Sequence, residues 1–95
     1  MPHIIIETSK ELSGVIKFED NFVRLHNLFN QTDQSFDPKS CRSRVLIANS
    51  YLSGVDIDSN FVHVSVKIYP GRSDEVKISL LNSLSRFFTE IIAPS

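Results

Sequence analysis

The second residue of the chain is a proline, and a proline at a free amino terminus carries a secondary amine that can act as a base. Pro2 follows Met1 and begins the stretch Pro-His-Ile-Ile-Ile-Glu at residues 2–7. An ordinary α-amino group titrates at about 8, and its removal from water disfavours the cationic form. Cleavage of Met1 would expose this amine, whereas a retained Met1 would leave a tertiary amide without basicity. Pro2 is therefore a candidate catalytic base and acid, on condition that Met1 is removed.

Three of the arginines could bind an anion beside such an amine. Arg42 and Arg44 are two residues apart, so on an extended backbone their guanidinium groups emerge on the same side and could bind a carboxylate in bidentate fashion. Arg72 follows a Pro-Gly turn at the expected start of a helix, where backbone N–H groups and the helix dipole favour an anion. The alternative interpretation is that all three are solvated cations, because arginine is mostly exposed in proteins.

The cysteine and the histidines favour neither thiol nor metal chemistry. Cys41 precedes two arginines, which could lower its pKa, but no histidine lies near it in the sequence as an activating base. The three histidines, His3, His26 and His63, show no ligand-like spacing with one another or with acidic residues. We therefore predict no metal site.

Length and composition limit the functions open to the chain. Its 95 residues predict a single domain, residues 1–95, with a small core and a weak margin of stability unless subunits associate. A net charge of −1 and a pI near 6.3 argue against general nucleic-acid binding. A single cysteine, the lack of a secretory signal and the shortness of the apolar runs predict a cytoplasmic protein that is not in a membrane.

The first half of the chain reads as a β-α-β unit. The β-branched run at residues 3–7 predicts a buried strand, and residues 44–51 predict a second one. Between them, apolar residues recur every three or four positions over residues 20–32, which predicts a helix with one apolar face. Gly14 lowers the helix propensity of residues 10–18, so we expect an irregular segment or a short turn there.

A second β-α pair follows a turn-rich loop at residues 53–60. Residues 61–68 alternate strictly between apolar and mostly polar side chains, which predicts a strand. Ser73 is a candidate N-cap for a helix that ends before Pro94. Two copies of one unit predict an α+β fold, a two-layer α/β sandwich in which the second β-α-β unit lacks its last strand.

Three motifs taken together resemble one known family. They are Pro-His-Ile-Ile-Ile-Glu at residues 2–7, Arg-Ser-Arg-Val at 42–45, and Phe-Val-His-Val-Ser-Val-Lys-Ile followed by Gly-Arg-Ser within 61–73. In this order and spacing they resemble the 5-carboxymethyl-2-hydroxymuconate delta-isomerases of the tautomerase superfamily, over nearly the whole chain. The resemblance implies a tautomerase-like fold of two β-α-β units, a homotrimer, and an active site that needs no metal or organic cofactor. Family members of this type continue into a further strand, which this chain lacks.

The resemblance also implies a role for each candidate residue. Pro2 would move one proton within an unsaturated 2-hydroxymuconate-type di- or tricarboxylate, as in the catabolism of aromatic compounds. Arg42 and Arg72 match two family arginines that would hold the substrate carboxylates, stabilise the dienolate and depress the pKa of Pro2. Arg44 is a supporting substrate-binding residue, which pairs with a carboxylate or reaches across a subunit boundary. The alternative function is a catalytically inactive relative that keeps the fold and binds small organic anions.

Overall fold

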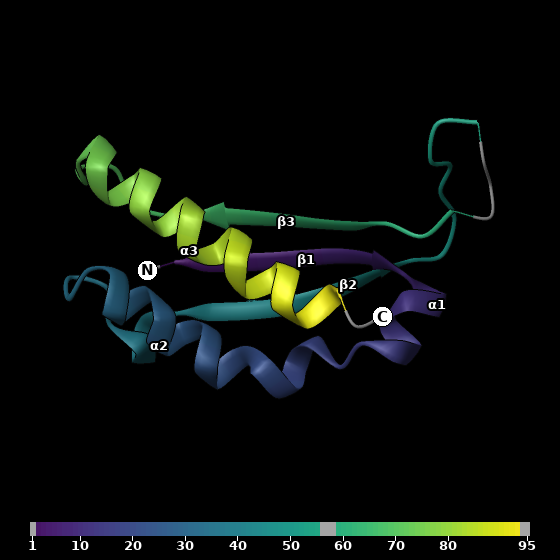
Figure 1. The fold of residues 1–95 in the computed structure, drawn as a ribbon, viewed down its shortest axis with the longest axis horizontal. Helices are drawn as coiled ribbons and strands as arrows, with labels where there is room; N and C mark the ends of the chain where they lie inside the picture. The colour runs from purple at the N-terminus through teal and green to yellow at the C-terminus, as the bar shows by residue number, and fades with distance from the viewer. Residues whose placement is uncertain (1, 56–58, 94–95) are drawn as a thin grey trace.

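The computed structural model describes residues 2–55 and 59–93, which form a layer of helices on one face of a sheet (Figure 1). Met1, residues 56–58 of the predicted loop, and the predicted helix stop Pro94 lie outside the described residues. In chain order the elements are β1 (His3–Ser9), α1 (Lys10–Val15), a 3-10 turn (Phe18–Asn21), α2 (Phe22–Thr32), a second 3-10 turn (Pro38–Ser40), β2 (Arg42–Ala48), β3 (Val62–Lys67) and α3 (Asp74–Ile92).

The sheet has the strand order β2-β1-β3, with β1 in the centre. β1 pairs with β2 in parallel, so that His3 lies opposite Arg42, and with β3 in antiparallel, so that His3 also lies opposite Lys67. Within the described residues no strand follows α3. The predicted α+β sandwich, with a second unit that lacks its last strand, is therefore confirmed.

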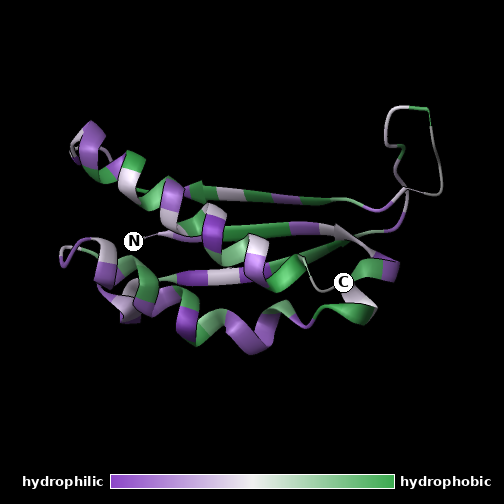
Figure 2. Cartoon of the chain, in the orientation of Figure 1, coloured by the Kyte–Doolittle hydropathy of each residue, from purple (hydrophilic) through white to green (hydrophobic). Residues whose placement is uncertain are grey.

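The core lies between this sheet and the helices. Ile4 and Ile6 of β1 are almost completely buried, because alternate residues of a strand face the same side and here that side is covered. Apolar and polar residues are interspersed along the helices (Figure 2), and α2 and α3 bury apolar residues against the sheet. The buried helix residues are Leu25 and Phe29 of α2 and Leu80, Leu84, Phe87 and Phe88 of α3. None of the described helices is both long enough and apolar enough to cross a membrane.

α3 begins where the sequence predicts it. The side-chain oxygen of Ser73 accepts a hydrogen bond from the backbone N–H of Val76 at 3.2 Å, and Asp74 and Glu75 follow in the first turn. A serine at this position satisfies one of the backbone donors that a helix start leaves unpaired. The N-cap prediction is therefore confirmed.

The segment after β1 was predicted wrongly, because residues 10–15 form the helix α1. Gly14 costs such a helix about 1 kcal/mol relative to alanine. Two features at the C-cap of α1 offset this cost: the N–H of Ile16 donates to the carbonyl of Leu12 at 2.9 Å, and the side chain of Ile16 is buried in the core. Tertiary burial thus outweighs propensity over this short helix.

β2 begins two residues earlier and ends three residues earlier than predicted, at Arg42 and Ala48. Its bounds follow from pairing, since each of its seven residues lies opposite one residue of β1, from His3 to Ser9. The hydrogen-bonding partner, rather than the local apolar pattern, sets the length of the strand.

α2 is also attached to β2 by a side-chain hydrogen bond. His26 Nε2 lies 2.6 Å from Ser43 Oγ, and the imidazole ring stacks on Phe22. Burial, followed by the positive charge of Arg42, lowers the pKa of His26 below its ordinary value of 6.5. The fold therefore favours the neutral form of this histidine.

The lowered pKa of His26 predicts a fold that loses stability in mild acid. Because the native state binds its proton less readily than the unfolded chain, the contribution of His26 is present above pH 6.5 and is lost as the pH falls through the native pKa. We expect the melting temperature to fall between pH 7.5 and pH 5.5, and the fall to be smaller in His26→Gln, which cannot titrate. An identical fall in the two proteins would contradict this role.

Candidate functional site

The sheet brings the predicted site residues to one of its ends. The first residue of β1 lies beside the first residue of β2 and the last residue of β3. Pro2, Arg42 and the turn that carries Arg72 therefore lie at the same end, where the N-terminus is marked near the start of α3 (Figure 1). Strand pairing thus assembles residues that are up to 70 positions apart in the chain.

Pro2 is buried and is bound to β2 through its backbone. Its carbonyl accepts a hydrogen bond from the N–H of Arg42 at 2.9 Å, which extends the parallel ladder by one residue. Burial around an amine favours its neutral form, which is the form that accepts a proton. Met1, on whose removal the predicted amine depends, lies outside the described residues.

Arg42 is held at the entrance to β2 by the turn before it. Its Nη1 donates to the carbonyl of Lys39 at 3.0 Å and to that of Cys41 at 3.1 Å. The side chain is exposed, and a guanidinium has five N–H donors, so two bonds leave capacity for a carboxylate. The electrostatic effect of Arg42 also extends to α2, where it contributes to the lowered pKa of His26.

Arg44 lies on the face of the sheet that no described helix covers, in contact with His3. Arg44 Nη1 is 3.1 Å from His3 Nδ1. Because a guanidinium only donates, Nδ1 must accept, which places the proton of a neutral imidazole on Nε2. The contact between Arg44 and His3 was not predicted from the sequence. The parallel pairing of the two predicted strands could have indicated it, because His3 and Arg44 then lie on the same face of the sheet.

Arg72 packs on the segment that follows α2. Its guanidinium carbon lies 3.9 Å from the ring centroid of Phe36, and Nη2 donates to the carbonyl of Ser35 at 3.4 Å. Phe36 is 1% exposed and meets Phe29 edge to face at 5.4 Å, so the ring is a rigid platform. Nε of Arg72 is buried and has no hydrogen-bond partner among the described residues.

The charge of Arg72 is also felt by the neighbouring loop. The pKa of Asp33 is lowered, first by hydrogen bonds from the backbone and side chain of Ser35 and to a smaller extent by the Arg72 guanidinium. The Ser35 N–H donates to Asp33 Oδ1 at 2.8 Å. This loop therefore carries an ionised carboxylate close to the arginine that it supports.

The structure groups the four predicted residues only in part. Pro2 and Arg42 are joined through their backbones, whereas Arg44 contacts His3 and Arg72 packs against Phe36. Over residues 2–55 and 59–93, no hydrogen bond joins any two of the three guanidinium groups to a shared partner. A single chain thus brings an amine position and three cations to one end of the sheet without closing them around one point.

Cys41, the residue before Arg42, is buried and not activated. It is 4% exposed, and its Sγ lies 3.6 Å from the carbonyl of Asp37. Burial raises the pKa of the thiol, which keeps it protonated at neutral pH. This agrees with the prediction that Cys41 is not a nucleophile.

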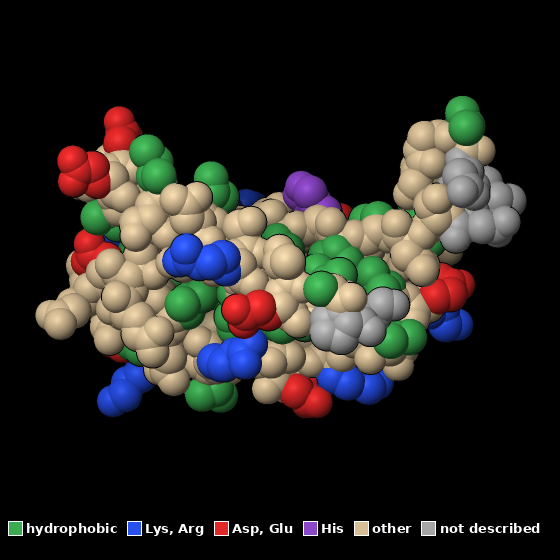
Figure 3. All heavy atoms as spheres, viewed as in Figure 1, with side chains coloured by type: hydrophobic (Ala, Val, Ile, Leu, Met, Phe, Trp, Pro, Cys, Tyr) green, Lys and Arg blue, Asp and Glu red, His purple; other side chains and the backbone are tan. Residues whose placement is uncertain are grey.

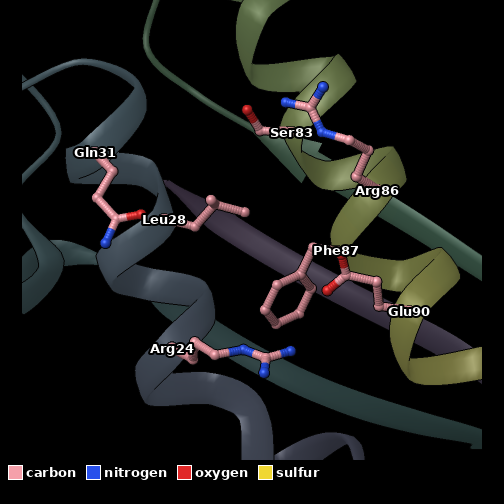
Figure 4. A pocket seen from close by; sticks show the side chains of 7 residues that line it. All are labelled: Arg24, Leu28, Gln31, Ser83, Arg86, Phe87 and Glu90. Atoms are coloured by element: carbon pink, nitrogen blue, oxygen red, sulfur yellow. The ribbon is translucent and has the colours of Figure 1, made fainter.

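A hollow of about 390 Å³ lies elsewhere, between α2 and α3 on the outer side of the helix layer (Figure 4). Leu28 and Phe87 form its apolar part, and Arg24 stands 4.7 Å over the ring of Phe87. Its other lining residues are Gln31, Ser83, Arg86 and Glu90. Charges of both signs lie on this face (Figure 3), and Arg86 points away from Arg24 (Figure 4). The hollow therefore presents no concentrated positive charge to a carboxylate substrate.

Comparison with known proteins gives one family and a set of similar structures. The model of the 5-carboxymethyl-2-hydroxymuconate isomerase family matches residues 2–95. A crystal structure of 5-carboxymethyl-2-hydroxymuconate delta-isomerase aligns with a TM-score of 0.86 at 18% identity, over 99% of this chain and 72% of that one. The crystal structure of Pt0534 inactivated by 2-oxo-3-pentynoate aligns with a TM-score of 0.74 at 20% identity, over 96% of this chain and 74% of that one.

The search of curated protein sequences found no match. At these identities the two structures establish the fold and nothing finer, whereas the family model covers almost every residue. The chain, with its tautomerase-like sandwich and its proline at position 2, belongs to the 5-carboxymethyl-2-hydroxymuconate isomerase family.

Proposed function

We propose that the protein is a cofactor-free isomerase of the tautomerase type, which moves one proton within an unsaturated 2-hydroxymuconate-type di- or tricarboxylate. The observation that carries the proposal is the position of Pro2, buried and bound through its carbonyl to the N–H of Arg42. Family membership supports the reaction class. A role in the breakdown of aromatic compounds in the cytoplasm would follow from such a substrate.

In the proposed mechanism the nitrogen of Pro2, freed by cleavage of Met1, first acts as the base. As a neutral secondary amine it takes a proton from the 2-hydroxyl group or from a carbon of the substrate, and as the resulting ammonium it returns the proton to a distant carbon. Such a shuttle works best when its pKa is close to the working pH. Burial of Pro2 acts in the direction of a lower pKa.

The arginines would hold and stabilise the charged substrate. Arg42 and Arg72 each retain N–H donors that could bind a carboxylate. Their fixed charge would also stabilise the dienolate that forms when the proton leaves. Arg44, held by His3, is proposed to bind a carboxylate or to act at a neighbouring subunit's site.

We propose that the chain assembles as a homotrimer, as the resemblance implies. The face of the sheet opposite the helices offers a surface for this contact, since Leu46 on it is about half exposed and Ile5 is partly exposed. Arg44 and His3 lie on the same face. Assembly on that face would bring the Arg44 guanidinium close to a second chain.

The second candidate is an inactive relative that binds small organic anions. The observation that favours it is the incomplete closure of the site, in which three guanidinium groups have separate supports within one chain. Turnover requires the proline amine, whereas anion binding requires only the arginines. The two functions therefore differ in their dependence on Pro2.

Substitution of Pro2 and of Arg72 tests the proposed isomerase function. With 5-carboxymethyl-2-hydroxymuconate as substrate, followed by ultraviolet absorbance, we expect Pro2→Ala to lower kcat/KM by about 10²- to 10⁴-fold, because the rigidly positioned secondary amine is replaced by a freely rotating primary amine. Arg72→Ala should lower it by about 10²- to 10³-fold, the usual cost of one anion-stabilising donor. Arg86→Ala is the matched control and should behave as wild type, because Arg86 is an exposed arginine of α3 that lies at the hollow between the helices. Unchanged turnover in both test variants would exclude the mechanism.

The state of the proline nitrogen can be tested by covalent labelling. 2-Oxo-3-pentynoate, which inactivates the structurally similar Pt0534, is an alkyne conjugated to a ketone and accepts nucleophiles at the alkyne carbon β to that ketone, which carries the methyl group. Addition of the Pro2 amine would form one C–N bond, break one alkyne π bond and move the amine proton to the neighbouring carbon. We expect the intact mass to lack methionine and to rise by the full mass of the reagent, with the adduct on Pro2.

The control for this labelling is a protein form that keeps Met1, whose Pro2 nitrogen is an amide and should take up no reagent at this position. Labelling on the buried Cys41 in place of Pro2 would contradict the proposed reactivity of the amine.

A further inference from the structure

The segment that follows α2 is fixed to the last turn of that helix. Asn30 Nδ2 donates to the carbonyl of Phe36 at 2.9 Å and to that of Gln34 at 3.4 Å. The backbone N–H of Phe36 donates to the carbonyl of Asp33 at 3.0 Å. This segment lies at the end of the sheet where the N-terminus is marked (Figure 1). The hydrogen bonds therefore fix the backbone from which the Phe36 ring extends, close to the candidate site.

The ring of Phe36 is itself held by the core. It is almost completely buried, and it meets the buried ring of Phe29 edge to face at 5.4 Å. Protein interiors are close-packed, so a buried ring in such a contact has few alternative positions. The guanidinium carbon of Arg72 lies 3.9 Å from the centroid of this ring. A rigid group of the core thus supports one side of the guanidinium.

Arg72 extends from a surface turn, where a long side chain would ordinarily be mobile. Gly71 before it and Ser73 after it are exposed. Even so, Nε of Arg72 is buried and has no acceptor among the described residues, and Nη2 donates to Ser35 at 3.4 Å. A buried donor without a partner costs free energy. The attraction between a cation and the face of an aromatic ring is the contact that accounts for this position.

This position leaves the charge of Arg72 available to an anion. The hydrogen bond that Arg72 makes within residues 2–55 and 59–93 goes to the uncharged carbonyl of Ser35. The nearby carboxylate of Asp33 accepts a hydrogen bond from the Ser35 N–H. A guanidinium has five N–H donors, so most of those of Arg72 are not used in this way. A side chain that is already oriented also loses less conformational freedom when it binds a ligand.

We infer that Phe36 is a positioning residue for Arg72: its ring holds the guanidinium ready for a substrate carboxylate, which would give the Nε–H the acceptor that it lacks. The inference rests on the proposed role of Arg72 in substrate binding. Phe36 is buried and acts through Arg72, without contact with the substrate. Loss of the ring should therefore weaken anion binding only where Arg72 is present.

A double-mutant cycle tests this dependence, with calorimetric binding of trans,trans-muconate as the readout. Muconate is a conjugated dicarboxylate without a 2-hydroxyl group, so its binding does not depend on turnover. Phe36→Leu keeps an apolar side chain but removes the ring. We expect it to raise the Kd by about 3- to 10-fold, because a mobile arginine must be ordered on binding. In the Arg72→Ala background, measured at higher muconate concentrations, it should change the Kd by less than about twofold.

Phe18→Leu is the matched control. Phe18 is also a buried ring, 2% exposed, in the 3-10 turn that precedes α2, and no cation of the described residues lies over it. This substitution should lower the melting temperature as Phe36→Leu does, but it should leave the Kd for muconate unchanged. A general loss of packing is thereby separated from a loss of positioning.

Nuclear magnetic resonance measures the position of the guanidinium directly. A proton over the face of an aromatic ring is shielded, so the Nε–H of Arg72 should resonate upfield in the wild type and lose this shift in Phe36→Leu. Added muconate should move the wild-type signal downfield, because the N–H then donates a hydrogen bond. These signals do not depend on whether the protein has isomerase activity.

The outcomes separate this inference from the proposed isomerase function. A wild-type protein that binds no muconate would overturn the inference. Equal binding by wild type and Phe36→Leu would overturn it too, as would the same loss with and without Arg72. Muconate binding that shows the expected coupling, without turnover of 5-carboxymethyl-2-hydroxymuconate, would support the positioning role of Phe36 and refute the isomerase.

Discussion

The hydrogen bonding of β1 along both of its edges is the constraint on which the rest of the structure depends. Its parallel pairing with β2 and its antiparallel pairing with β3 fix the ends of both neighbours relative to residue 3. The same strand buries Ile4 and Ile6 beneath the helices. Core formation and the convergence of Pro2, Arg42 and the Arg72 turn thus follow from one strand, and a shift in its register would disturb all of them together.

Each cation near the candidate site is held by contacts that also stabilise the fold. Arg42 closes the turn before β2, Arg44 binds His3, and Arg72 stacks on Phe36. A guanidinium that is already oriented by the protein loses less conformational freedom when an anion binds. The same contacts occupy some of its donors, and each of the three groups has a separate support. The contacts that orient each guanidinium group are therefore also the reason that the three groups do not converge on one point within a single chain.

The sequence was sufficient for the architecture, but less so for features set by contacts between distant residues. Residues 61–68 alternate so strictly that β3 could be predicted, and Ser73 predicted the start of α3. α1 could not be predicted, because Gly14 is unfavourable for a helix and the compensating burial of Ile16 is tertiary. The contact of Arg44 with His3 was not predicted, because it depends on strand register. The contact of Arg72 with Phe36 was not predicted either, because it depends on the path of a loop.

Because the helices cover only one face of the sheet, the other face could both contact a second chain and carry a guanidinium group that binds an anion. All of the described helices that pack on the sheet contribute to one buried layer, which leaves Arg44, His3 and Leu46 on a face without a cover. A core of this size leaves a small domain with little stability in reserve, so burial of the uncovered face would add stability where a guanidinium also lies. Contacts between chains would reduce the exposure of that cation to water and strengthen its interaction with an anion. In the proposed trimer, the face that one chain leaves open would be the surface on which a second chain contributes to binding.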